Sequence, residues 1–147
     1  MTDHKSVTIV LVEDDPGHAR LIEKNLRRAS ITNDIIKLED GRKTLDFFFP
    51  GEERRKFFRL PMPMLVLLDL NLPIVDGYQV LKSLKENPAT KNIPVIILTT
   101  TDDPREVQRC YDLGCNIYVT KPVDYEKFAE AITKVGLFLS VVTVPGE

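Results

Sequence analysis

The chain has 147 residues, of which 43% are hydrophobic and 29% are charged, and its formal net charge at pH 7 is −2. These totals are typical of one globular domain, and they argue against general nucleic-acid binding, which usually needs a basic surface. No apolar stretch is long enough to span a membrane, and the polar residues 1–6 lack the apolar core of a signal peptide. We therefore expect a cytoplasmic protein with no nucleic-acid or membrane partner.

Five short apolar runs predict five strands. The run at 64–68 is the clearest, because all of its residues are apolar and prolines at 61, 63 and 73 bound it. Such a run is typical of a strand that is buried on both faces, and its length argues against a helix. The five predicted strands cover residues 6–12, 31–38, 64–68, 93–98 and 116–119.

The segments between these runs have apolar residues spaced three and four apart, which predicts helices. Pro16 and Pro104 suit first helical turns, Asp102 or Asp103 can cap the helix that starts at Pro104, and Gly114 can end it. Alternating strands and helices indicate an α/β fold in which a parallel sheet is covered by helices on both faces. The predicted helices start at residues 16, 42, 77, 104 and 125.

In residues 50–63 the apolar residues show no clear helical or strand periodicity, and basic and aromatic side chains are frequent. A segment of this length is unusual for a loop in a compact domain. We expect a solvated helix extension followed by a loop in which Phe57 and Phe58 cover the sheet edge, and a loop that docks a partner is the alternative. The two cysteines, Cys110 and Cys115, are too few for a disulfide framework or a zinc site, so we expect reduced, buried thiols.

Charged and hydroxylated residues follow the predicted strands, and parallel strands end at the same edge of a sheet. Two carboxylates about 4 Å apart repel each other by roughly 4 kcal/mol at an effective dielectric constant of about 20, so such a cluster needs a cation or a lysine. Carboxylate and carbonyl oxygens suit Mg²⁺. This combination favours transfer of a phosphoryl group to Asp69. The residues expected at this edge are Glu13, Asp14, Asp15, Asp69, Thr99 and Lys121.

Five motifs occur in order, each after a predicted strand: VEDDP at 12–16, LDLNLP at 68–73, DG at 76–77, LT at 98–99 and YVTKP at 118–122. Together they resemble the receiver domain of two-component response regulators, which are signalling domains rather than enzymes. The resemblance covers about residues 7–140 of a single domain that we expect to span 1–147. It implies a flavodoxin-like, doubly wound (βα)5 fold with strand order 2-1-3-4-5.

The resemblance also implies roles for single residues. Asp69 resembles the phospho-acceptor, and Lys121 resembles the lysine that pairs with the phosphoryl group. The Mg²⁺ site would consist of Asp14, of Glu13 acting through water, of Asp69 itself and of the backbone carbonyl of Asn71.

Thr99 and Tyr118 resemble the switch pair of the family, which acts on the face formed by the helix from 104, the strand at 116–119 and the helix from 125. Asn71 and Thr101 match positions that tune hydrolysis of the aspartyl phosphate. The family usually has a cis peptide bond at the position of Lys121–Pro122. For Asp15 we expect exposure to solvent or stabilisation of the helix dipole, and for His18 an exposed position without a ligand role.

Two other functions compete with a phosphoryl-accepting switch. A haloacid-dehalogenase-type phosphatase also uses a strand-end aspartate with Mg²⁺, but it needs a second Asp where this chain has Asn71. A flavin-binding module needs a phosphate loop after the first strand, where Glu13, Asp14 and Asp15 would repel phosphate. We favour the switch, and a phosphotransfer intermediate remains an alternative to it.

The helix predicted at 125–139 has two apolar stripes, of which only one can face its own core. Homodimerisation through the second stripe and the apolar tail at 141–147 is therefore expected, with packing of the tail on its own domain as the alternative. We expect no DNA-binding module, so output would pass through the domain surface. The long segment at 50–63 and the tail resemble stand-alone regulators paired with bacteriophytochrome histidine kinases. The dimer candidates are Ala131, Phe138, Val141, Val142 and Val144.

Overall fold

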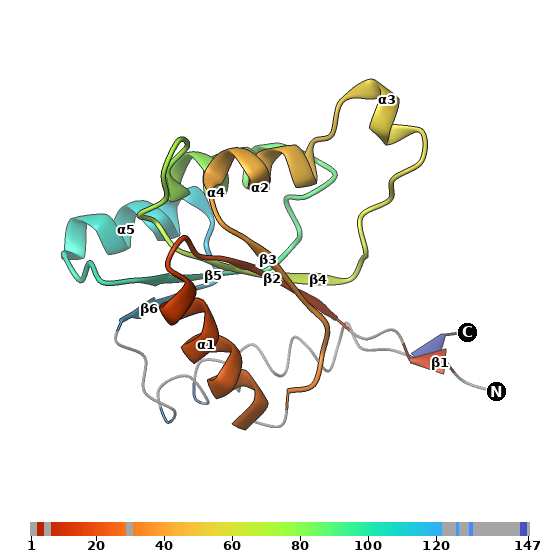
Figure 1. Cartoon of the computed structure of the whole chain (residues 1–147). Coiled ribbons are helices and arrows are strands. Elements are labelled where there is room, and N and C mark those ends of the chain that lie inside the picture. The colour runs from red at the N-terminus through yellow and green to blue at the C-terminus, as the bar shows by residue number, and fades with distance from the viewer. Residues whose placement is uncertain are drawn as a thin grey trace.

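A computed structural model describes residues 3–4, 7–28, 31–121, 126, 130 and 145–146. Its centre is a sheet of five parallel strands in the order β3-β2-β4-β5-β6 (Figure 1). Counted along the chain, this is the order 2-1-3-4-5, so the predicted flavodoxin-like fold is confirmed. The strands are β2 (Thr8–Val12), β3 (Ile35–Leu38), β4 (Met64–Leu68), β5 (Val95–Thr99) and β6 (Ile117–Thr120).

Helices cover both faces of the sheet. Figure 1 shows α1 on one face and α2, α4 and α5 on the other. Successive side chains of a strand point to opposite faces, so Ile9 and Leu11 pack with α1, whereas Val10 and Val12 pack in the cluster on the other face. Every residue of β4 is buried, as expected for the central strand. The helices are α1 (Pro16–Arg28), α2 (Gly41–Phe48), α3 (Glu52–Arg55), α4 (Gly77–Glu86) and α5 (Pro104–Leu113).

The predicted ends of α5 are confirmed. The Asp103 carboxylate accepts a hydrogen bond from the Arg105 amide, and Pro104 occupies the first turn. Gly114 ends the helix with a φ of 106°, in the left-handed region that glycine adopts without steric cost.

The predicted start of the second strand is wrong by a few residues. Strand β3 begins at Ile35 rather than at Ile31. Residues 31–34 instead complete the turn out of α1, where the Ile31 amide donates to the Leu26 carbonyl at 3.0 Å. The Asn33 side chain donates to the Val7 carbonyl at 2.7 Å, which fixes this turn beside the sheet.

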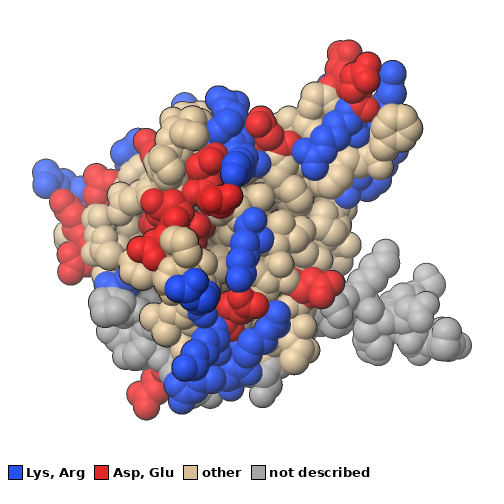
Figure 2. Space-filling model, viewed as in Figure 1, with Lys and Arg blue, Asp and Glu red and all other residues tan. Residues whose placement is uncertain are grey.

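Residues 50–63 form a projection, which we call the arm, and α3 lies within it (Figures 1 and 2). The expectation that Phe57 covers the sheet edge is wrong, because 89% of Phe57 is exposed. Phe58 is half-buried and packs edge-on against Phe47 of α2, with ring centroids 5.6 Å apart. The turn that follows α3 points these two adjacent side chains in different directions. Only one of the two rings can therefore pack against the body of the domain.

Two short strands near the ends of the chain were not predicted. β1 (Asp3–His4) pairs antiparallel with β7 (Pro145–Gly146), apart from the main sheet. The predicted helix at 125–139 lies outside the described residues except for Glu126 and Glu130, and so does the Lys121–Pro122 peptide bond. All five dimer candidates, Ala131, Phe138, Val141, Val142 and Val144, also lie outside the described residues. No helix in the described ranges is long and apolar enough to cross a membrane.

Candidate phosphoryl-acceptor site

The register of β2 and β4 brings two acids together. Val12 pairs with Leu68 at the carboxyl ends of these strands, so Glu13 and Asp69 follow side by side. The Asp69 amide donates to the Val12 carbonyl at 3.0 Å, and the Glu13 amide donates to the Leu38 carbonyl of β3 at 3.0 Å. These backbone bonds fix both residues at the strand-order reversal, where ligands bind in folds of this class.

Asp14 completes a three-carboxylate cluster. One carboxylate oxygen from each of Glu13, Asp14 and Asp69 lies within 4.8 Å of the other two. Glu13 and Asp69 are each only 6% exposed, whereas Asp14 is exposed. Burial raises the pKa of Glu13 above its ordinary value, and the nearby Asp69 charge adds to this rise. The cluster is therefore a place where a positive charge is strongly favoured.

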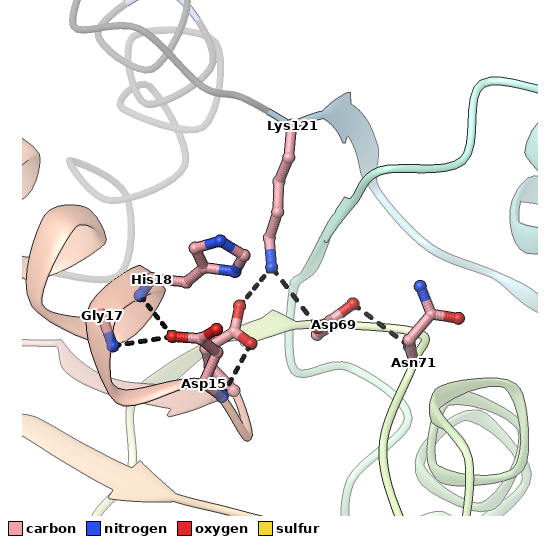
Figure 3. Close-up of polar contacts among 7 residues, drawn as sticks. Asp15, Gly17, His18, Asp69, Asn71 and Lys121 are labelled. Atoms are coloured by element: carbon pink, nitrogen blue, oxygen red, sulfur yellow. Dashed lines mark hydrogen bonds and ion pairs between the residues drawn. The ribbon is translucent and has the colours of Figure 1, made fainter.

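Lys121 supplies one such charge from the residue that follows β6. Its Nζ contacts Oε1 of Glu13 and lies 3.4 Å from Oδ2 of Asp69 (Figure 3). The side chains alone are nearly buried: the exposed fraction of the side chain is 9% for Lys121, 2% for Glu13 and 7% for Asp69. In this position the ammonium bridges the two acids and opposes the rise of the Glu13 pKa.

Asp15 is directed away from this cluster. Its Oδ1 accepts hydrogen bonds from the Gly17 amide at 2.8 Å and from the His18 amide at 3.1 Å (Figure 3). These two bonds lower the Asp15 pKa and satisfy free amides in the first turn of α1. Asp15 and His18 are both exposed, as predicted, and Asp15 lies at the start of α1, where a negative charge stabilises the helix dipole.

The loop after β4 packs tightly behind Asp69. The Asn71 amide donates to Oδ1 of Asp69 at 3.1 Å, which orients the carboxylate (Figure 3). Gly77 starts α4 so close to this loop that a Cβ there would lie 2.3 Å from the Asp69 carbonyl oxygen. Within the loop, Ile74 has a φ of 73° and is 77% exposed, which is an unusual conformation for a β-branched residue.

Thr99 is the last residue of β5, and Tyr118 is the second residue of the neighbouring strand β6. Thr99 is fully buried, and its Oγ1 has no hydrogen-bond partner among the described residues. The Tyr118 hydroxyl donates to the Thr101 carbonyl at 2.5 Å, and its ring packs against the core beside α4 and α5. Desolvation raises the pKa of Tyr118 to about 12.

An open cavity of about 240 Å³ lies over these strand ends. Thr100 lines it, although sequence reasoning did not single this residue out. Its position directly after Thr99 at a strand tip was the only signal available. The other lining residues are Glu13, Asp14, Asp15, His18, Asp69, Asn71 and Lys121.

The donor set at this cavity fits a hard divalent cation. Three carboxylates offer oxygen ligands within a small radius, and Asp14 is exposed and has no ammonium within 4.0 Å among the described residues. Among the described residues, the ligand group consists of these three acids, and it does not include His18, although His18 also lines the cavity.

Residues 9–133 match the response regulator receiver domain family, and the chain therefore belongs to this family. Receiver domains are signalling domains rather than metabolic enzymes. Response regulator Rcp1 of Synechocystis sp. is 36% identical over 138 residues, which cover 93% of this chain and 92% of Rcp1.

Solved structures give the same assignment. A receiver domain from Rhodospirillum rubrum is 58% identical, with a TM-score of 0.76 and coverage of 95% of this chain and 97% of that one. The Mn²⁺-bound form of Rcp1 is 35% identical, with a TM-score of 0.75 and coverage of 95% of this chain and 99% of the Rcp1 chain. The phosphorylated cyanobacterial phytochrome response regulator RcpA is 30% identical, with a TM-score of 0.75 and coverage of 97% of this chain and 99% of the RcpA chain.

Proposed function

We propose that the chain is a stand-alone response regulator that accepts a phosphoryl group from a histidine kinase on Asp69. The observation that carries this proposal is the placement of the Lys121 ammonium against Glu13 and Asp69. Thr99 ends the neighbouring strand β5, where its carbonyl accepts a hydrogen bond from the Lys121 amide at 2.6 Å and its buried hydroxyl has no partner in the described part of the chain. A nucleophilic carboxylate and a cation at one cavity, with an available hydroxyl at the end of the adjoining strand, are what a phosphoryl acceptor requires.

In the proposed reaction, a carboxylate oxygen of Asp69 forms a bond to phosphorus while the bond from phosphorus to the kinase histidine nitrogen breaks. The hydrogen bond from the Asn71 amide to Oδ1 holds the carboxylate in one orientation. Lys121 is close enough to exchange its contact with Oδ2 for one with a phosphoryl oxygen.

The proposed metal is Mg²⁺. Glu13, Asp14, Asp69 and the backbone carbonyl of Asn71 would hold it, and the three carboxylates already lie close together. When bound, the ion would neutralise charge on the phosphoryl oxygens. The Mn²⁺-bound form of Rcp1 supports this proposal, because it is a related receiver that holds a divalent cation.

The proposed switch uses Thr99 and Tyr118. A phosphoryl oxygen would offer a hydrogen-bond partner to the Thr99 hydroxyl, and movement of this residue would open space beside the Tyr118 ring. Tyr118 would then give up its bond to the Thr101 carbonyl, which changes the surface of α5 and β6. Phosphorylation shifts this equilibrium only by the difference in its contacts with the two arrangements.

The proposed kinase partner is linked to a phytochrome photoreceptor. Support comes from the similarity to RcpA, which is a cyanobacterial phytochrome response regulator. The expected homodimer, through the last predicted helix and the tail, remains a proposal from the apolar pattern of the sequence alone.

Incubation with acetyl phosphate and Mg²⁺, followed by intact-protein mass spectrometry, tests the phosphoryl-acceptor role. We expect a mass gain of one phosphoryl group that EDTA and Asp69→Asn both abolish. Asp34→Asn is the matched control, because Asp34 is exposed and precedes β3, away from the site. A mass gain that persists in Asp69→Asn would contradict the proposal, and steady release of phosphate from many phosphomonoesters would indicate a phosphatase instead.

A further inference from the structure

The arm differs in charge from the rest of the molecule. It carries four basic residues and two acidic ones, on a chain whose net charge is −2. Figure 2 shows basic side chains along the arm where it projects from the body. Phe57 at 89% and Met62 at 51% exposure add apolar surface to it. The arm therefore presents apolar and positively charged groups together.

A cavity of about 370 Å³ lies between the arm and the end of α2. Aromatic and aliphatic side chains form most of its wall, and Phe48 of α2, only 4% exposed, joins this wall to the core. Two arginines complete the lining. The lining residues are Phe48, Pro50, Arg55, Phe58, Arg59, Leu60 and Met62.

Both arginines of the cavity can take a carboxylate. Nη1 of Arg59 donates to the backbone carbonyls of Arg55 at 3.0 Å and Phe58 at 3.1 Å, which holds its guanidinium at the arm. A guanidinium has five donors, so others remain for a ligand. Within the part of the chain that the structure describes, no carboxylate oxygen lies within 4.0 Å of a charged nitrogen of Arg55 or Arg59.

We propose that this cavity docks an acidic segment of a partner protein. An apolar side chain of the segment fills the space beside Phe58 and Leu60, and adjacent carboxylates pair with Arg55 and Arg59. Charge complementarity and the apolar wall select this occupant. The cavity of about 370 Å³ is larger than a small acid would fill, which favours a polypeptide segment.

The position of the cavity allows docking and phosphorylation at the same time. The arm leads into the amino end of β4 at Met64, whereas Asp69 follows the carboxyl end of the same strand. Figure 1 shows the arm projecting at the far end of the sheet from these strand tips. A partner held by the arm would therefore leave the phosphoryl-acceptor site open.

Selection of short random peptides displayed on phage against the full chain tests the proposal. We expect enriched peptides in which Asp or Glu flanks Leu, Phe or another large apolar residue. Binding of these peptides, measured by fluorescence anisotropy, should weaken by about tenfold or more in Arg55→Glu/Arg59→Glu. Lys82→Glu/Lys91→Glu is the matched control, since it changes the charge equally at exposed positions outside the cavity.

Reversing the charges on both partners distinguishes a lost contact from misfolding, because a misfolded variant would not gain binding. Peptides whose acids are replaced by Lys should bind Arg55→Glu/Arg59→Glu better than they bind the original chain. Phosphorylation by acetyl phosphate, measured on the same samples, reports separately on the proposed function and on folding.

Several outcomes would overturn the docking proposal. Enriched peptides without acids, failure to enrich any peptide, or equal binding to both double variants would each do so. Loss of a homodimer in Arg55→Glu/Arg59→Glu, seen by size-exclusion chromatography without any peptide binding, would show that a second copy occupies the cavity instead. Binding of duplex DNA or RNA through the same arginines, again without peptide binding, would assign the arm to nucleic acid.

Discussion

Lys121 and Asp69 face each other across the ends of two strands, with Nζ 3.4 Å from Oδ2. Lys121→Met retains the length of the side chain and removes its charge, which leaves Glu13 and Asp69 buried without this cation. We expect the free energy of unfolding in EDTA to fall by about 3 kcal/mol, as measured by urea denaturation. Lys24→Met, at an exposed position of α1, should change it by less than about 0.5 kcal/mol.

The same Lys121→Met variant should bind Mn²⁺ more tightly than the original chain, because the carboxylates lose their resident cation. Added Mn²⁺ should then recover part of the lost stability, since a ligand that binds only the folded state stabilises it. Isothermal titration calorimetry checks the affinity. Unchanged stability together with unchanged Mn²⁺ affinity would show that Lys121 does not neutralise the acids.

Thr99→Val should leave stability unchanged or raise it by up to about 1 kcal/mol, because the buried Oγ1 of Thr99 makes no hydrogen bond to the described residues. Thr44→Val is the matched control. Thr44 is equally buried, but its Oγ1 donates to the Asp40 carbonyl at 2.8 Å, so its loss should cost about 1 kcal/mol. Thermal unfolding of both variants tests this contrast, and equal destabilisation would contradict it.

Gly77→Ala should cost about 2 kcal/mol, because the added Cβ would overlap the backbone of the loop that carries Asp69. We also expect slower phosphorylation by acetyl phosphate, since the loop must move. Gly51→Ala provides the control, because no atom of the described residues lies within 4 Å of a Cβ at this position. An Ala at 77 that is as well tolerated as an Ala at 51 would mean that this close approach does not constrain the loop.

The two cysteines predict a loss of stability at high pH. Desolvation raises the pKa of Cys110 to about 11 and that of Cys115 to about 12, from an ordinary value of 9.0. Both thiols therefore bind their protons more tightly in the folded state than in the unfolded state. Their contribution to the free energy of unfolding is complete below pH 9 and is lost as the pH rises toward 11 and 12. Cys110→Ala/Cys115→Ala should lose less stability over this range in urea titrations.

The buried thiols should also react slowly with a disulfide reagent at pH 8, and unfolding in urea should accelerate the reaction greatly. Rapid modification of the folded chain would contradict the burial of Cys110 and Cys115.

The sequence predicted the gathering of the acids because the relevant strands are short and strongly apolar. Once 64–68 is a central parallel strand, Asp69 must lie at its carboxyl end, and Glu13 and Lys121 follow from the same rule applied to β2 and β6. This reasoning locates residues at a sheet edge. It does not supply the side-chain contacts, such as the bond from Tyr118 to the Thr101 carbonyl, which depend on packing.

The arm was less predictable, because local sequence does not decide which of two adjacent rings reaches the domain. Phe58 packs against Phe47, whereas Phe57 is exposed. The pairing of Asp3–His4 with Pro145–Gly146 was missed for a similar reason. Two-residue strands have no periodicity of their own, and contact between distant segments alone defines them.

The arm also separates Glu13 from Asp69 along the chain, although β2 and β4 pair along their whole lengths. Cleavage after exposed Arg54 or Arg55 would leave these acids on two fragments that share one sheet. Neither fragment alone would contain the complete set of residues of the proposed phosphoryl-acceptor site. The two halves of this protein, expressed separately, could therefore serve as a complementation reporter. Phosphorylation would then report that two proteins fused to the halves interact.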